Sequence, residues 1–214
     1  MAFQKQASRG NEAELIEWRD SITKDPVRRG LIRLAPITVM VEFSCESACS
    51  YAAARGDLRI LKLLHTAGFS MAPEVMEYAA RGGYLDCLKF AASKLCICYA
   101  EVCEESALGG HLPCLMFLYE RGCARTMKTC EYAVTGGDLA CVVYIVENMP
   151  GIFDERHNDT DNLCQIAAGQ GDLKCLQYLH NKGAFWNWCT PEWAKRDDHS
   201  ECLQYALENG CPCD

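Results

Sequence analysis

The stretch that decides the fold runs from residue 167 to residue 179 and reads AAGQGDLKCLQYL. Alanines lead into a glycine and an aspartate, and apolar residues then recur at the spacing of one helix face. A close copy, AAARGDLRILKLL, occupies residues 52–64. Two copies so far apart indicate an internal repeat, and a repeat decides the whole fold.

A glycine or its equivalent follows each alanine-rich segment, and we call this position the marker of its unit. The markers are Gly56, Gly83, Gly110, Gly137, Gly171 and Asp198. Successive markers are 27 residues apart, except for a 34-residue step between the fourth and the fifth. Each unit has Ala or Ser four residues before the marker, Leu or Val five after it, and Leu, Phe or Tyr seven after it. Agreement over six units establishes a tandem repeat.

Each unit reads as two short helices. An alanine-rich first helix precedes the marker, and the marker glycine supplies a turn. Apolar positions two, four, five, seven and eight past the marker then form one stripe of a second helix. A second glycine twelve past the marker ends that helix in four units, at Gly68, Gly122, Gly183 and Gly210. One pair cannot bury its stripe, but stacked pairs can, which predicts an all-α solenoid of about six helix-turn-helix units.

The repeated strings resemble the ankyrin repeat family. The resemblance rests on residues 167–173 with Leu176, Leu179 and Gly183, and on residues 52–58 with Leu61, and it covers about residues 45–214. The family's period is 33 residues, and the residues missing from the shorter unit fall where the family carries its β-turn finger. The resemblance implies a stack of ankyrin-like repeats that binds proteins, with room for a finger only in the 34-residue unit.

Residues 1–44 do not keep the repeat, so we divide the chain into an N-terminal cap, 1–44, and a repeat array, 45–214. The cap is predicted to be partly helical, with one helix over residues 11–21, and to cover the apolar side of the first unit. Two alternatives stay open for this segment. It could be a separate functional domain or the docking segment of an adaptor.

Composition narrows the functional classes. The net charge is -8 and the isoelectric point about 5.2, which argues against nucleic acid, because a binder of nucleic acid needs a basic face. The longest apolar stretch, residues 34–41, is far shorter than the roughly 20 residues of a transmembrane helix, and no secretory signal is recognisable. We expect an intracellular, cytoplasmic protein that binds no membrane, in a reducing compartment where disulfides do not form.

The sixteen cysteines are the unusual feature of the composition. Twelve of them occupy three columns of the repeat, and the column four past the marker contains Cys87, Cys114, Cys141, Cys175 and Cys202. A metal site would gather its ligands in one place, whereas these cysteines are spread along the stack. We therefore interpret them as small buried side chains and predict no metal and no cofactor. The alternative is a cysteine-based redox sensor or a zinc protein, with Cys-x-Cys half-sites at residues 96–98 and 211–213.

No catalytic constellation is recognisable, because the Cys114 and His111 pair lacks an orienting acid and an oxyanion signature. We predict that the protein is not an enzyme but a monomeric, non-catalytic module that binds a protein partner through its exposed ridge and inter-repeat loops. The alternative is an adaptor that recruits substrates to a larger complex. The candidate partner-binding residues are Arg55, Phe69, Met71, Arg81, Tyr99, Arg125, Phe185, Trp186 and Trp188.

Two segments carry further expectations. The aromatic loop around Trp186 either folds back over the helix ends or forms a hot spot for a partner. The seven extra residues of the long step fall within residues 147–162 and predict a projecting loop.

Overall fold

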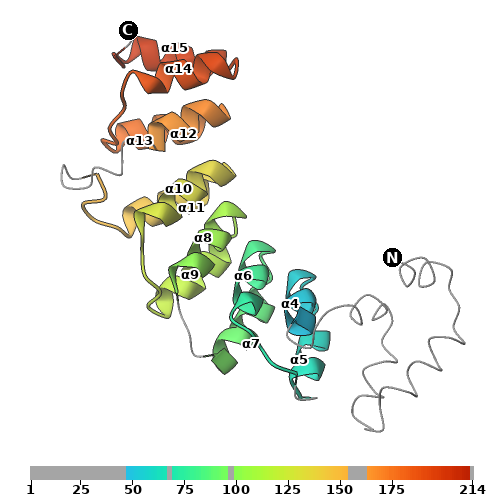
Figure 1. Cartoon of the computed structure of the whole chain (residues 1–214). Helices are drawn as coiled ribbons and strands as arrows, with labels where there is room; N and C mark the ends of the chain where they lie inside the picture. The colour runs from blue at the N-terminus through green and yellow to red at the C-terminus, as the bar shows by residue number, and fades with distance from the viewer. Residues whose placement is uncertain (1–46, 67–68, 96–98, 154–162, 213–214) are drawn as a thin grey trace, which may run out of the picture.

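A computed structural model describes residues 47–66, 69–95, 99–153 and 163–212 (Figure 1). The predicted N-terminal cap lies outside these residues. The helices in chain order are α4 (Ser47–Ala54), α5 (Leu58–Thr66), α6 (Glu74–Arg81), α7 (Leu85–Leu95), α8 (Ala100–Leu108), α9 (Leu112–Glu120), α10 (Met127–Gly136), α11 (Leu139–Glu147), α12 (Leu163–Gln170), α13 (Leu173–Asn181), α14 (Cys189–Arg196) and α15 (Ser200–Glu208). The described residues contain helices and no strand, so the all-α class is confirmed.

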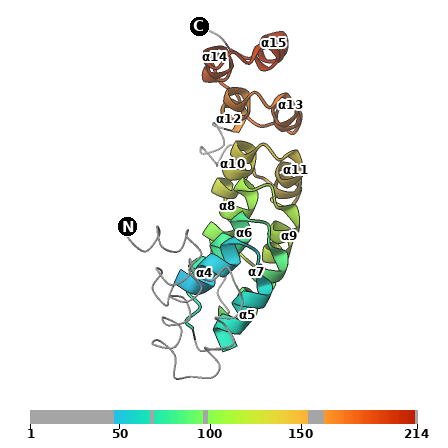
Figure 2. The ribbon, with the colours of Figure 1, turned by 90° about the vertical axis from the view of Figure 1, so that its right-hand side faces the viewer.

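The helices form six antiparallel pairs that stack into a curved array, as the repeat predicts. In each pair the even-numbered helix precedes the marker and the odd-numbered helix follows it. Even-numbered helices pack on one another along the stack, and so do odd-numbered ones. Figure 2 shows the even-numbered helices on the concave side of the array and the odd-numbered helices on the convex side. We call these two sides the inner face and the outer face.

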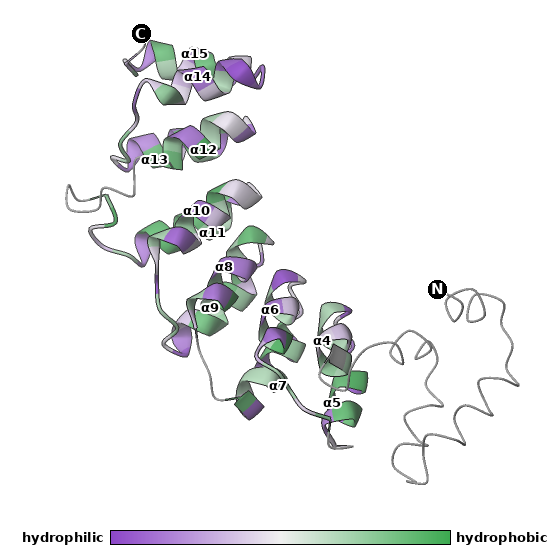
Figure 3. Ribbon diagram, viewed as in Figure 1, coloured by the Kyte–Doolittle hydropathy of each residue, from purple (hydrophilic) through white to green (hydrophobic). Residues whose placement is uncertain are grey.

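Burial follows the repeat columns. In α6 the buried side is made by Val75, Met76, Ala79 and Ala80, and Figure 3 shows that most helices mix apolar and polar residues, as expected of elements that bury one side. The column three residues before the marker is buried Ala or Val in the first five units, but it is the exposed Lys195 in the sixth. The last described unit therefore carries a polar residue where the others pack against a following unit.

The marker residues adopt the backbone conformation that the turn requires. The marker glycines have φ between 69° and 72°, and Asp198, in the place of a glycine, has φ 62°. This is the left-handed region, which glycine adopts without the steric penalty of a Cβ atom. The predicted role of the markers is therefore confirmed.

In three of the described units the residue after the marker carries an aromatic ring that packs on the unit before it. In the third unit this residue is His111, and its ring lies against Gly83, the marker of the second unit. The His111 Nε2 also donates a hydrogen bond to the Arg81 carbonyl at 2.9 Å. Tyr84 covers Gly56 and His199 covers Gly171 in the same way. The glycines are thus needed for close approach as well as for the turn.

An aspartate replaces the ring in other units and caps the second helix instead. Asp138 accepts a hydrogen bond from the Cys141 amide at 2.7 Å at the start of α11, and Asp172 accepts one from the Cys175 amide at 3.1 Å at the start of α13. Each carboxylate satisfies a helix N-terminal amide that has no partner within the helix. The position after the marker therefore serves either the helix that follows or the unit that precedes.

The cysteine columns lie in the core. The thiols four past the marker and seven before it are buried and free among the described residues, as the packing interpretation predicts. Cys123, which lies in the third column thirteen past its marker, is disulfide-bonded. The expectation that the chain forms no disulfide is therefore wrong for Cys123, whose bonding partner lies outside the described residues.

The long step between the fourth and fifth units begins with a packed segment. Ile152 is buried, and Met149 and Phe153 lie against the core. The expectation of a projecting loop is therefore wrong for residues 149–153, because apolar side chains hold this part on the stack. Residues 154–162 lie outside the described residues. Across this step α12 packs on α10 less extensively than other neighbouring inner helices pack on each other.

Candidate partner-binding surfaces

An aromatic column runs along the inner face, five residues before the marker. It contains Tyr51, Tyr78, Tyr132 and Trp193, and Tyr78 is 45% exposed. Cations lie against several of these rings: Lys128 Nζ is 5.6 Å from the Tyr132 ring centroid and Arg196 Cζ is 4.6 Å from that of Trp193. The rings of Tyr51, Tyr132 and Trp193 are partly buried, and that of Tyr78 is exposed.

Charged pairs connect consecutive units on the same face. Arg81 Nε lies 2.7 Å from Glu105 Oε2, which joins α6 to α8, and Lys128 Nζ lies 3.2 Å from Glu104 Oε2, which joins α10 to α8. Glu104 is nearly buried, and its hydrogen bond raises the pKa of the Lys128 ammonium. Since α6 and α8 together contain five glutamates and one arginine, the inner face is acidic in this part of the stack.

The outer face of the first three units is basic and aromatic. Phe90 on α7 lies between Lys62 from the unit before, at 5.8 Å, and Lys94 from its own helix, at 5.6 Å. Phe117 on α9 lies in the same way between Lys89, at 5.8 Å, and Arg121, at 5.7 Å. At exposed sites each contact of this kind contributes about 0.5–1 kcal/mol. We call these six residues the ring patch.

Sequence reasoning missed the ring patch, although its signal was present. Its phenylalanines occupy the column seven past the marker, and its cations lie six and eleven past the marker. The helices α5, α7 and α9 with Arg121 contain five basic and two acidic residues, a net charge of +3. The net charge of a continuous stretch of sequence does not reveal this excess of positive charge, because the basic residues gather on the outer face only.

Three of the sequence candidates are exposed arginines that contact their own array. Arg55 donates a hydrogen bond to the Tyr51 hydroxyl at 3.4 Å, and Arg81 pairs with Glu105 on the inner face. Arg125 donates to the Asn148 carbonyl at 3.2 Å, and its Cζ lies 5.1 Å from the Tyr119 ring centroid. Arg125 therefore connects the third unit to the fourth.

Three further candidates pack within the array. Phe69 and Met71 are half-buried against the core. Tyr99 donates its hydroxyl to the Pro73 carbonyl at 2.8 Å and lies 3.1 Å from Glu77 Oε1. Burial, followed by the Glu77 charge, raises the pKa of Tyr99. These contacts give all three residues a structural role.

The C-terminal aromatic loop contains both kinds of residue that its sequence suggested. Trp186 folds back and stacks on His180, with ring centroids 3.8 Å apart, and the His180 Nδ1 lies 2.9 Å from the Tyr205 hydroxyl. Phe185 is 56% exposed and Trp188 is 46% exposed. Trp186 thus belongs to the packing between the last two units, whereas Phe185 and Trp188 are accessible.

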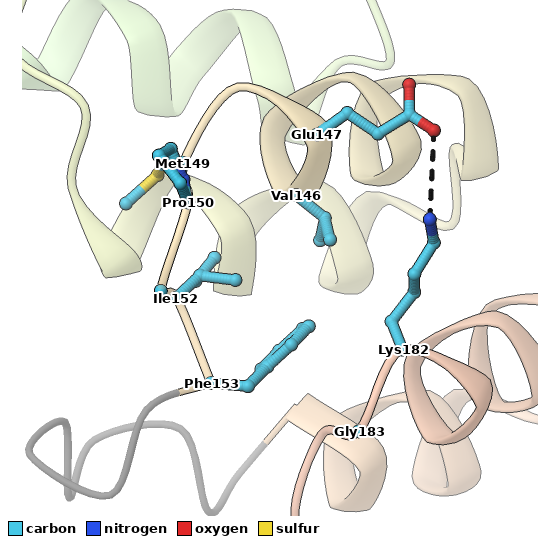
Figure 4. A pocket seen from close by; sticks show the side chains of 9 residues that line it. Val146, Glu147, Met149, Pro150, Ile152, Phe153, Lys182 and Gly183 are labelled. Carbon is cyan, nitrogen blue, oxygen red and sulfur yellow. Dashed lines mark ion pairs between the residues drawn. The ribbon is translucent and has the colours of Figure 1, made fainter.

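A pocket of about 380 Å³ lies between the fourth and fifth units (Figure 4). Val146, Ile152 and Phe153 contribute apolar side chains, and the Lys182 Nζ lies 3.9 Å from Glu147 Oε1 beside them. The volume is at the low end for a ligand site. The pocket combines these apolar side chains with polar groups, among them the Glu147 and Lys182 ion pair.

The described part of the chain provides little for thiol or metal chemistry. Burial raises the pKa of Cys103, Cys130 and Cys164 to about 12, so these thiols stay protonated at neutral pH and react slowly. Within the described ranges no three His, Cys, Asp or Glu side chains come together as a metal site would require. None of the described helices is both long and apolar enough to cross a bilayer.

Comparison with known proteins identifies the fold. No protein-family model and no curated protein matches the sequence. The ankyrin repeat domain of human ASB11 is similar in structure, with a TM-score of 0.64 and 20% identity, over 78% of this chain and 85% of that chain. A chain in the structure of the Bd0816 predatory endopeptidase from Bdellovibrio bacteriovorus in complex with immunity protein Bd3460 is also similar, with a TM-score of 0.61 and 16% identity, over 77% and 99% of the two chains. The protein therefore has an ankyrin-like repeat fold.

Proposed function

We propose that the protein is a non-catalytic protein-binding module that holds its partner on the inner face. The observation that carries this proposal is the aromatic column of the inner face, which recurs in four of the six units on the concave side. Concave surfaces of repeat arrays suit extended partners, and aromatic side chains supply much of the binding energy of protein interfaces. The structural likeness to an ankyrin repeat domain agrees with a binding role.

The candidate residues divide between contact and support in this proposal. On the inner face, the side chain of Arg55 contacts Tyr51 and that of Arg81 contacts Glu105. Phe185 and Trp188 are accessible near the C-terminal end of the stack. These four are the proposed contact residues. Phe69, Met71, Tyr99 and Trp186 pack within the array, and Arg125 connects the third and fourth units from the surface.

Site-specific photocrosslinking tests the proposed surface. A benzophenone amino acid placed at Tyr78 should crosslink the full-length protein to a partner in cell extract, because Tyr78 is exposed on the inner face. The matched control places the same group at Lys174, which is exposed on α13 of the outer face, away from the ring patch. Loss of the Tyr78 adduct in a Tyr132→Ala and Trp193→Ala background would tie the adduct to the column. Equal crosslinking at both positions would contradict the proposal.

A further inference from the structure

The ring patch is a second surface, on the side opposite the proposed partner site. We propose that it binds an acidic protein segment whose carboxylates pair with the four cations that surround Phe90 and Phe117. This interaction is separate from the one on the inner face and would let the module hold two partners at once.

The structure fixes the positions of these cations. Each phenylalanine receives one cation from its own unit and one from the unit before, so the contacts repeat with the array. Arg121 is held further by a hydrogen bond from its Nη2 to the Ala92 carbonyl at 3.3 Å. His65 adds a third titratable group beside Phe90, with ring centroids 5.7 Å apart. Side chains ordered in this way lose less entropy when a partner binds.

Among the described residues, none of the ion pairs involves the four cations of the ring patch. The acids on the same helices, Asp86 and Glu120, are exposed and fewer in number. The four cations, which outnumber these two acids and form no ion pair among the described residues, make a local site for anionic groups on a chain of net charge -8.

The geometry favours a protein segment over nucleic acid. The basic area covers three units only, and the acidic inner face and the net charge would repel a long polyphosphate. Neighbouring helices lie roughly 8–10 Å apart, and one three-residue turn of a polyproline II segment advances about 9 Å and returns to the same side. A polyproline II segment with a carboxylate at every third residue therefore matches the spacing of the units.

The third unit determines the direction in which the segment binds. The column that holds Lys62 and Lys89 continues with Met116, which is 39% exposed. Along this column, the bound segment should therefore present acidic residues to Lys62 and Lys89 and an apolar residue to Met116.

Fluorescence anisotropy with a synthetic peptide tests the inference. The probe is a fluorescein-labelled peptide with glutamate at every third position, serine between, and one leucine three residues beyond the last glutamate. The double variant Lys89→Glu with Lys94→Glu should bind it at least tenfold more weakly than the wild-type full chain. Lys174→Glu with Lys195→Glu is the matched control, because these exposed lysines lie on α13 and α14 and change the net charge equally. The control should stay within twofold of wild type.

Further measurements distinguish the proposed binding from misfolding of the variants and from binding at the inner face. Lys89→Gln with Lys94→Gln should cause an intermediate loss, and thermal unfolding should show that all variants are folded. The Tyr78→Ala and Tyr132→Ala variant should bind the peptide normally, which separates this surface from the inner face. Equal loss in the Lys174 control, equal binding of a glutamine version of the peptide, or tighter binding of a DNA duplex would overturn the inference. So would concentration-dependent self-association that the Lys89 and Lys94 changes abolish.

Discussion

At the scale of single residues, the turns between paired helices are the most demanding positions. Gly83 has φ 71°, and a Cβ atom added there would lie 2.5 Å from the Nδ1 of His111. Gly122 has a similar left-handed φ of 84°, but nothing lies within 4 Å of its added Cβ. The two glycines therefore separate the requirement for a backbone conformation from the requirement for space.

This comparison gives a first prediction. Gly122→Ala should lower the free energy of unfolding by about 1–2 kcal/mol, the usual penalty for a left-handed alanine. Gly83→Ala should lower it further, because the new methyl group also displaces the His111 ring and its hydrogen bond to Arg81. Urea unfolding of both variants measures the difference. Equal losses would show that the ring moves aside without cost.

Buried thiols link stability to pH, which gives a second prediction. Burial raises the pKa of Cys49, Cys87 and Cys114 from 9.0 to about 11 in the folded chain, whereas unfolding returns them to their ordinary value. The folded state therefore retains protons that the unfolded state loses, and stability that is complete at pH 8 should fall as the pH rises from 9 to 11. Urea unfolding at several pH values measures this slope.

Cys114→Val is the control for the pH series. Valine fills a similar volume, so the stability at pH 7 should change by less than about 1.5 kcal/mol, while the slope above pH 9 becomes shallower. Cys114→Asp should destabilise strongly, because it places a carboxylate in the core. A flat profile between pH 8 and 10.5 in the parent protein would contradict the link between burial and titration.

At the scale of helices, the residue after the marker decides how each second helix begins. Asp138 caps α11 through the Cys141 amide, whereas His111, at the N-cap position of α9, makes no side-chain cap. An aspartate after the marker stabilises the helix that follows, whereas an aromatic ring at the same position packs on the unit before. Which of the two occurs differs from unit to unit.

The cap gives a third prediction. Asp138→Ala should reduce stability by about 1 kcal/mol, and Asp138→Asn should restore most of the loss because asparagine also caps helices well. Thermal and urea unfolding of the two variants provide the test. The same loss in both would mean that the carboxylate charge, and not the hydrogen bond to Cys141, stabilises α11.

The sequence predicted elements better than surfaces. Columns of Ala, Leu and Cys at fixed distances from the marker located every helix pair, because burial forces these residue types to recur. The burial of Ile152 could not be predicted in this way, because it lies in an insertion with no equivalent in other units. The ring patch was missed too, because the pairing of Lys62 with Phe90 crosses from one unit to the next and is visible only once the units are stacked.

At the scale of the molecule, the long step divides the array. Packing between α10 and α12 is less extensive than between other inner neighbours, and the pocket lies at the same junction. Since each unit contacts only its neighbours, a weak junction limits cooperativity along the stack.

A fourth prediction follows from this division. Trp186, Trp188 and Trp193 all lie in the last two units, so in a Trp18→Phe background their fluorescence reports on those units alone. Urea unfolding followed by fluorescence should give a different midpoint from unfolding followed by circular dichroism, which reports on all helices. Ile152→Ala should separate the two midpoints further by removing side-chain packing at the junction. Coincident transitions in both proteins would show that the array unfolds as one unit.

Lys195 bears on how such an array can lengthen by duplication. Copying an internal segment of the first five units would reproduce the buried Ala or Val that a following unit needs, so the copy could be inherited without a second mutation. A copy placed directly after the sixth unit would instead press a new helix against an ammonium group, which is costly to remove from water. Units duplicated within the first five therefore meet a compatible neighbour at once, whereas a unit packed directly on the sixth requires a change at Lys195.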